Sequence, residues 1–118
     1  MLTNFESLTS ELNEIEMVMV PICIRCFGKY TKSNPIKAPE IVSRMKQAGY
    51  KLTEPRLRKI VNHIRSNSLQ PLIATSDGYF VSEDPAEIKK QILSLYERAA
   101  SIRRCADGLS AFLPSYNL

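Results

Sequence analysis

The stretch KLTEPRLRKIVNHIRS, residues 51–66, decides the fold because it predicts a short amphipathic helix in the middle of the chain. Its apolar side chains recur at helical spacing, at Leu57, Ile60, Val61 and Ile64. That spacing puts them on one helical face, which we expect to enter a hydrophobic core. Thr53 is a favourable N-cap and Pro55 suits a first turn, so the helix should begin at Thr53 or Glu54.

The remaining surface of this helix is polar and basic. Together with the short segment before the helix, it carries Lys51, Arg56, Arg58, Lys59, Asn62, His63 and Arg65. Lysine and arginine bind phosphates and an asparagine amide reads base edges, so these residues form the candidate DNA-binding site. A basic helical face is more often simply a solvated face, and the interpretation therefore depends on the flanking sequence.

The flanking sequence predicts a helix before the basic helix and a hairpin after it. Residues 38–48 place Ile41, Met45 and Ala48 on one helical face, and Gly49 follows as a stop signal. Downstream, two β-prone runs at 71–75 and 79–82 flank a Ser-Asp-Gly sequence, and Asp-Gly is a strong hairpin signal. The expected order is helix, turn, basic helix, hairpin.

The run from Ile36 to Val81 resembles the winged helix-turn-helix superfamily. The resemblance lies in a helix with a Glu-Ile start, a turn containing glycine, a helix capped by threonine with Ile-Arg near its end, and LIATSDGYFV as the wing. The chain also resembles small uncharacterised proteins of bacteria and their phages that continue past the wing into a long helix. No single motif is diagnostic, and the order and spacing of the motifs, which are moderately specific, carry the likeness.

This resemblance implies that the second helix of the pair lies in the DNA major groove. It places at the groove or its rims Arg56, Arg58, Lys59, Asn62 and His63. There is one departure from the superfamily. Wings often carry an arginine or lysine that reaches DNA, whereas this tip is Ser76-Asp77-Gly78, and an aspartate is repelled by phosphate. Wing contacts with DNA are therefore in doubt.

Charge is distributed unevenly along the 118 residues, whose net charge is +4. Residues 1–20 contain four glutamates and no lysine or arginine, so the rest of the chain carries +8. Residues 44–65 contain seven basic side chains against Glu54 alone. A positive field concentrated on the predicted helix pair favours a polyanionic partner.

Cysteine usage and the N-terminal residues favour a cytoplasmic protein without cofactor or metal. The chain has three cysteines, no basic N-terminal region typical of a signal peptide, and no apolar run of membrane-spanning length. Cys23 and Cys26 have the spacing of a zinc half-site or redox pair. Buried thiols on an apolar helix are the favoured interpretation, because the other candidate ligands, His63 and Cys105, lie far away in sequence.

The C-terminal part predicts a long helix with a coiled-coil seam. Asp84-Pro85-Ala86-Glu87 has the pattern of a capping box with proline at the first helical position. Apolar residues then alternate by four and three positions, at Ile88, Ile92, Leu95, Ala99, Ile102, Ala106, Leu109 and Leu113. We call these residues the seam and expect it to form a homodimer. The alternative is that the helix folds back onto its own domain.

The N-terminal residues form an acidic segment with an apolar stripe at the same spacing, interrupted by Pro21: Leu8, Leu12, Ile15, Met19, Ile22 and Cys26. We expect an arm over residues 1–20 that packs beside the basic C-terminal helix of its own or a second chain. In that arrangement Glu14 and Glu16 would meet Arg98, Arg103 or Arg104.

The sequence thus predicts a mainly α fold with a small β-hairpin (α+β): an N-terminal arm (1–20), a winged-helix core (21–83) and a dimerisation helix (84–113). The favoured function is sequence-specific binding of double-stranded DNA, in transcription or in the handling of phage or mobile-element DNA. The main alternative is a protein–protein interaction module in replication or packaging, and a redox or metal protein is a third. We expect no enzyme and no small-molecule ligand, because His63 has no nucleophile or orienting carboxylate at suggestive spacing.

Overall fold

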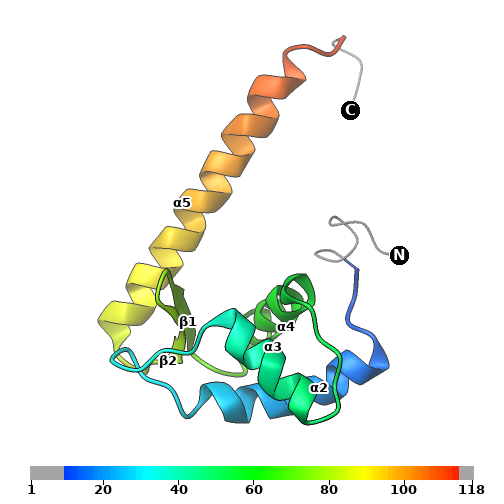
Figure 1. Ribbon diagram of the computed structural model, residues 1–118. Helices are drawn as coiled ribbons and strands as arrows, with labels where there is room; N and C mark the ends of the chain where they lie inside the picture. Colours follow the sequence, from blue (N-terminus) through cyan, green and yellow to red (C-terminus); the bar gives the residue numbers. More distant parts are fainter. Residues whose placement is uncertain (1–9, 115–118) are drawn as a thin grey trace. The chain divides into compact units, whose positions relative to one another are not determined.

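The computed structural model describes residues 10–114. Within them the elements follow in this order (Figure 1): α2 (Glu14–Phe27), α3 (Ala38–Gln47), α4 (Glu54–Ser66), β1 (Leu72–Thr75), β2 (Gly78–Val81) and α5 (Pro85–Ser110). This is the mainly helical α+β class, with one small antiparallel hairpin, that the sequence predicts. The chain divides into two units between Glu83 and Asp84, and each unit is described by itself.

Helix α2 begins at a reciprocal capping box. The Asn13 side chain accepts a hydrogen bond from the Glu16 backbone N at 2.8 Å, and the Glu16 carboxylate accepts one from the Asn13 backbone N at 3.0 Å. The helix then runs through Pro21, which corrects the expected interruption, and it continues across residues 20 and 21, where the predicted arm and core meet. Pro21 is exposed on the side of α2 away from the core, so the helical hydrogen bond that its missing N–H omits lies on the outer side of the helix, while the opposite face is anchored in the core.

Helices α3 and α4 are joined by a short turn at Gly49. Gly49 has φ +91°, a backbone conformation that glycine adopts without steric cost. The Thr53 hydroxyl then caps α4 by accepting a hydrogen bond from the Arg56 backbone N at 3.4 Å. Of the two predicted starts, Thr53 is thus the N-cap, and α4 ends at Ser66, the last residue of the stretch quoted above.

The hairpin pairs β1 with β2 in the register Leu72↔Val81 to Thr75↔Gly78, with Ser76 and Asp77 at the turn. Ile36 is attached to β2 by two backbone hydrogen bonds with Tyr79, of 2.9 and 2.7 Å. Gly78 has φ +131°, and a Cβ atom there would lie 2.5 Å from the Ile36 carbonyl oxygen. Glycine at this position is thus what allows the segment before α3 to approach the hairpin.

One hydrophobic core unites α2, α3, α4 and the hairpin. It consists of Met19, Val20, Cys23, Phe27, Ile36, Ile41, Met45, Leu52, Leu57, Ile60, Val61, Ile64 and Leu72. Helix α4 contacts α2, α3 and β1, and the four apolar residues predicted for its inner face are all buried. The opposite face of α4 is thereby held outward on a rigid support.

Helix α5 begins at Asp84, whose carboxylate accepts a hydrogen bond from the Ala86 backbone N at 3.0 Å. Gly108 lies within the helix, which ends at Ser110, so Leu113 of the seam and the last residues of the predicted range 84–113 fall beyond it. No residue of α5 is buried. Across residues 10–114, no helix is both long enough and apolar enough to span a membrane.

Candidate nucleic-acid interface

The outer face of α4 is the candidate interface, and the structure brings most of the predicted residues together there. Arg58 and Asn62 are exposed and lie one helical turn apart. Lys59 and His63 form the adjacent row and are half-buried, while Lys51 is exposed in the segment just before the helix. The face therefore offers cations for phosphates beside the exposed amide of Asn62.

Two of the predicted residues, Arg65 and His63, also take part in hydrogen bonds at the C-terminal end of α4. The Arg65 Nε donates a hydrogen bond to the Leu72 backbone oxygen at 3.0 Å and so ties the end of α4 to β1. Asn67 donates from its side-chain amide to the His63 backbone oxygen at 2.9 Å, which satisfies a carbonyl at the C-terminus of α4. Arg65 thus helps to orient the hairpin as well as contributing positive charge.

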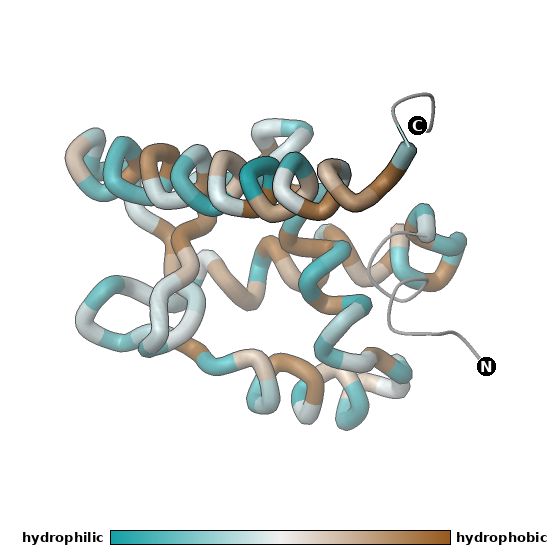
Figure 2. Tube along the Cα trace, turned by 90° about the horizontal axis from the view of Figure 1, so that it is seen from above, coloured by the Kyte–Doolittle hydropathy of each residue, from teal (hydrophilic) through white to brown (hydrophobic). Residues whose placement is uncertain are grey.

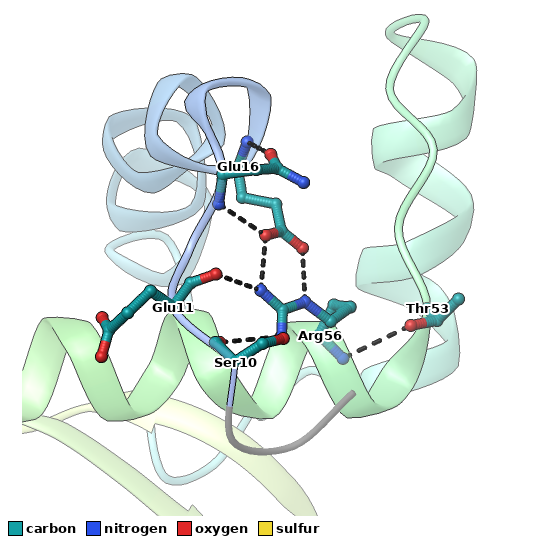
Figure 3. A network of polar contacts seen from close by, with 6 residues as sticks. Ser10, Glu11, Glu16, Thr53 and Arg56 are labelled. Atoms are coloured by element: carbon teal, nitrogen blue, oxygen red, sulfur yellow. Dashed lines mark hydrogen bonds and ion pairs between the residues drawn. The ribbon is translucent and has the colours of Figure 1, made fainter. Parts of the chain in front are cut away.

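Arg56 does not lie at the interface, contrary to the expectation from sequence. Its side chain is 9% exposed and donates two hydrogen bonds of 2.6 Å to the carboxylate of Glu16 (Figure 3). The same guanidinium donates to the Ser10 backbone oxygen and hydroxyl at 3.0 and 2.9 Å, and to the Glu11 backbone oxygen at 3.0 Å. The guanidinium therefore faces α2 and the segment before it, and we remove Arg56 from the DNA-binding set.

The position of Glu16 explains why Arg56 turns inward. Glu16 lies on the buried face of α2, in line with Met19, Val20 and Cys23, and its side chain is only 7% exposed. A buried carboxylate needs a cation with several donors, and the planar guanidinium of Arg56 supplies them in a bidentate pair. Glu16 thus pairs with Arg56 rather than with the expected arginines of α5.

The pair is ionised at neutral pH. Hydrogen bonding to Arg56 lowers the pKa of Glu16 below its usual 4.5, although burial opposes the shift. The same hydrogen bonding raises the pKa of Arg56. Because the two charges compensate each other, the positive charge on the outer face of α4 comes from Arg58, Lys59 and Arg65.

The hairpin tip carries no cation. Ser76 and Asp77 are exposed, and the Asp77 backbone N donates to the Thr75 hydroxyl at 3.2 Å. An exposed carboxylate at the tip does not favour phosphate contacts. The polar surface suited to a nucleic acid is therefore on α4 and not on the hairpin.

The cysteines of α2 are placed as core residues. Cys23 is buried, and burial raises the pKa of its thiol to about 12, so it carries a neutral thiol at physiological pH. A neutral thiol is a poor nucleophile and a poor metal ligand. Within the described part of the chain, no group of three or more histidine, cysteine or acidic side chains is arranged to hold a metal ion.

The candidate interface therefore consists of Lys51, Arg58, Lys59, Asn62, His63 and Arg65, on or next to one helix that the core holds in place. The sequence signal for the missed Glu16–Arg56 pair was a glutamate in the apolar stripe of α2, which implies a buried cationic partner. No protein-family model, curated protein or solved structure matches this chain, so these residues themselves carry the functional argument.

Proposed function

We propose that this protein binds double-stranded DNA as a winged helix-turn-helix protein, with α4 in the major groove. The observation that carries the proposal is the outer face of α4, where exposed Arg58 and Asn62 lie one turn apart beside Lys59. The order of α3, turn, α4 and hairpin supports it, because this is the order of elements in that superfamily.

Each side chain has a defined role in this proposal. Lys51, Arg58, Lys59 and Arg65 neutralise phosphates and set the position of α4 on the duplex. Asn62 reads an adenine edge, to which an amide can form two hydrogen bonds. His63 lies at the rim of the groove. The role is transcriptional control or the handling of phage or mobile-element DNA, in the cytoplasm.

We further propose a homodimer that forms through the seam of α5. Ile92, Leu95, Ile102 and Leu109 are 43%, 36%, 70% and 70% exposed in a single chain. Burying such a stripe against a second copy stabilises association. A two-fold dimer would bind an inverted repeat, with half-sites about one helical turn apart or a multiple of it.

A second candidate function is protein binding. It is favoured by the outward face of α2, where Ile15, Met17 and Val18 are 62%, 45% and 52% exposed. Apolar side chains gathered on one exposed face often mark a protein-binding surface.

Selection from random duplex DNA at two salt concentrations separates the two functions. DNA binding predicts enrichment of a defined sequence, with less bound at the higher salt concentration. Recovery of the unselected pool at both concentrations would remove the DNA proposal and leave protein binding.

The salt dependence of DNA affinity measures the phosphate contacts. If about four to six phosphates are neutralised, log affinity should fall with log salt at a slope of roughly −4 to −5. Arg58→Ala and Lys59→Ala should each reduce the slope by about one on all sequences. Arg25→Ala, which removes an exposed arginine from α2, is the control and should leave the slope unchanged. Equal slopes in all four proteins would exclude α4 as the phosphate-binding helix.

Asn62→Ala tests base reading. The substitution should weaken binding to the selected site by about 1–3 kcal/mol, because the adenine edge loses its bidentate partner. Binding to random duplex should change much less. Ser66→Ala, one turn further along the same face, is the matched control. Equal losses on both DNAs would show that Asn62 only positions the backbone. Filter binding or fluorescence anisotropy at one fixed salt concentration gives the comparison.

A further inference from the structure

The seam of α5 carries information about how two copies pair. Brown, apolar segments recur along α5, the helix that leads to the C-terminus in Figure 2. In heptad terms, Ile92, Ala99 and Ala106 occupy one seam position, a, and Ile88, Leu95, Ile102 and Leu109 occupy the other, d. Positions e and g flank the seam directly, and charges there set the orientation of a pair.

The charged side chains of α5 are sorted around the seam. The cations Lys89, Arg98 and Arg103 occupy e and g positions and therefore flank it. All three acidic residues of the helix lie at positions away from the seam: Glu87, Glu97 and Asp107. The charges next to the seam are thus positive only, and any self-pairing must keep them apart.

Parallel pairing in register does not keep them apart. It sets each g position beside the next e position of the second helix, so that Arg98 lies beside the partner's Arg103, twice per dimer. It also sets Ala99 against the partner's Ala99 and Ala106 against the partner's Ala106. Layers of two alanines between layers of two leucines or isoleucines pack poorly, because one spacing between helices cannot fit both.

One antiparallel register resolves both problems. It places Leu95 opposite the partner's Ala106, and Ala99 opposite the partner's Ile102, so each small residue faces a large one. At the flanks, where e meets e and g meets g, Arg98 lies beside the partner's Cys105. Tyr96 lies beside the partner's Arg103, within reach of a cation–π contact.

The neighbouring antiparallel registers are excluded by charge. A shift of one heptad toward the N-terminus sets Arg98 beside the partner's Arg98. The opposite shift sets Arg103 beside the partner's Arg103. Like charges in contact are destabilising, so a single register remains.

We propose that α5 pairs with α5 of a second copy in antiparallel orientation, with the two-fold axis passing between Ala100 and Ser101. This inference rests on the homodimer proposed above and specifies its geometry. At 1.5 Å per residue, the two Asp84 residues, where the DNA-binding units are attached, are then about 50 Å apart along the helix pair. In a parallel pair they would be only about 10 Å apart. The antiparallel dimer therefore separates the two points of attachment by more than one turn of DNA, which is about 34 Å.

Distances between spin labels decide the orientation. Lys90→Cys and Arg104→Cys are labelled separately in a Cys26→Ser/Cys105→Ser background, and both positions lie away from the seam. Antiparallel pairing predicts that the Lys90 labels are about 15 Å further apart than the Arg104 labels, because residue 90 lies further from the axis. Equal distances would establish parallel pairing and overturn the proposal. Loss of the dipolar signal, with a monomer in sedimentation, would also overturn it.

Two charge variants provide an independent check without labels. Cys105→Glu sets a carboxylate beside the partner's Arg98 in the antiparallel register and should lower the dimer dissociation constant about fivefold. Arg98→Glu should leave it within about twofold, whereas in a parallel pair it would replace repulsion by attraction. Tighter dimers with Arg98→Glu and not with Cys105→Glu would refute the antiparallel register. No arm of this test uses DNA, so its failure is distinguishable from failure of the α4 proposal.

Discussion

Glu16→Ala is expected to lower the free energy of unfolding of the N-terminal unit by about 3 kcal/mol, because it leaves the guanidinium of Arg56 buried against α2 without its anion. Removing one partner of a buried ion pair typically costs about 3–5 kcal/mol. The loss expected here is at the lower end because the side chains of Glu16 and Arg56 lie at the edge of the core, 7% and 9% exposed. Single domains are stable by only about 5–15 kcal/mol, so this loss is large. Chemical denaturation followed by circular dichroism measures it.

Two controls separate burial from ion pairing as such. The exposed pair Glu40–Arg44, with an N–O distance of 3.0 Å, is of the same chemical type. Glu40→Ala should therefore leave the free energy of unfolding nearly unchanged. The double variant Glu16→Met/Arg56→Met should regain most of the loss, because two apolar side chains of similar volume replace the pair. A single Glu16→Ala variant as stable as the wild type would show that the pair is not structurally important.

The same pair predicts how stability depends on pH. The pKa of Glu16 is lowered in the folded protein, so the unfolded chain binds the proton more tightly. The stabilisation is therefore complete above the unfolded pKa of 4.5 and is lost as the pH falls through the lower, folded pKa. Glu16→Gln should remove this part of the acid sensitivity. If the wild type and Glu16→Gln lose stability in parallel below pH 4.5, other carboxylates are responsible.

The double variant also tests the removal of Arg56 from the interface. Since its guanidinium is bonded to Glu16 and to the segment at Ser10 and Glu11, it contributes no phosphate contact in our proposal. The salt slope of Glu16→Met/Arg56→Met should therefore match that of the wild type.

The sequence predicted α4 and the hairpin well because local rules determine them. The helical spacing of Leu57, Ile60, Val61 and Ile64 specified the buried face, and Thr53 supplied the start. Gly78 was expected from turn chemistry alone. The structure adds a second reason, since the backbone of Ile36 passes too close for any side chain. That contact joins segments distant in sequence, and no local pattern reveals it.

Arg56 was misplaced because it lies at the border of two faces on the helical wheel. At a border, the neighbouring element decides which way a long side chain turns, and the neighbour here is α2. Glu16 was assigned to an acidic arm by charge, although its spacing matched the buried stripe of Met19 and Cys23. Periodicity was the better guide than charge for this residue. The sequence predicts an interruption at Pro21 because proline removes a hydrogen bond from a helix. The helix continues here because Pro21 lies on the exposed side of α2, away from the core.

In the dimer proposed here, Leu95→Lys is expected to convert the paired protein into a monomer at concentrations where the wild type is a dimer. The substitution removes an apolar side chain from the centre of the seam and brings a charge into the helix–helix contact twice per dimer. Leu93→Lys is the matched control, because Leu93 is also exposed, at 50%, but lies off the seam. Sedimentation velocity over a range of concentrations gives the comparison. A wild-type monomer whose Leu95→Lys variant unfolds would mean that α5 covers its own domain.

If the proposed dimer binds DNA as proposed, the loss of pairing should greatly weaken DNA binding. In a dimer, binding of the first α4 holds the second near its half-site, and such linkage raises affinity by about 10²–10⁴ without new contacts. Leu95→Lys should lose that factor on a selected inverted repeat and bind an isolated half-site as the wild type does. Leu93→Lys should match the wild type on both DNAs. Equal affinities of the wild type for one and two half-sites would show that the seam does not serve DNA recognition, because the second α4 would then contribute nothing to binding.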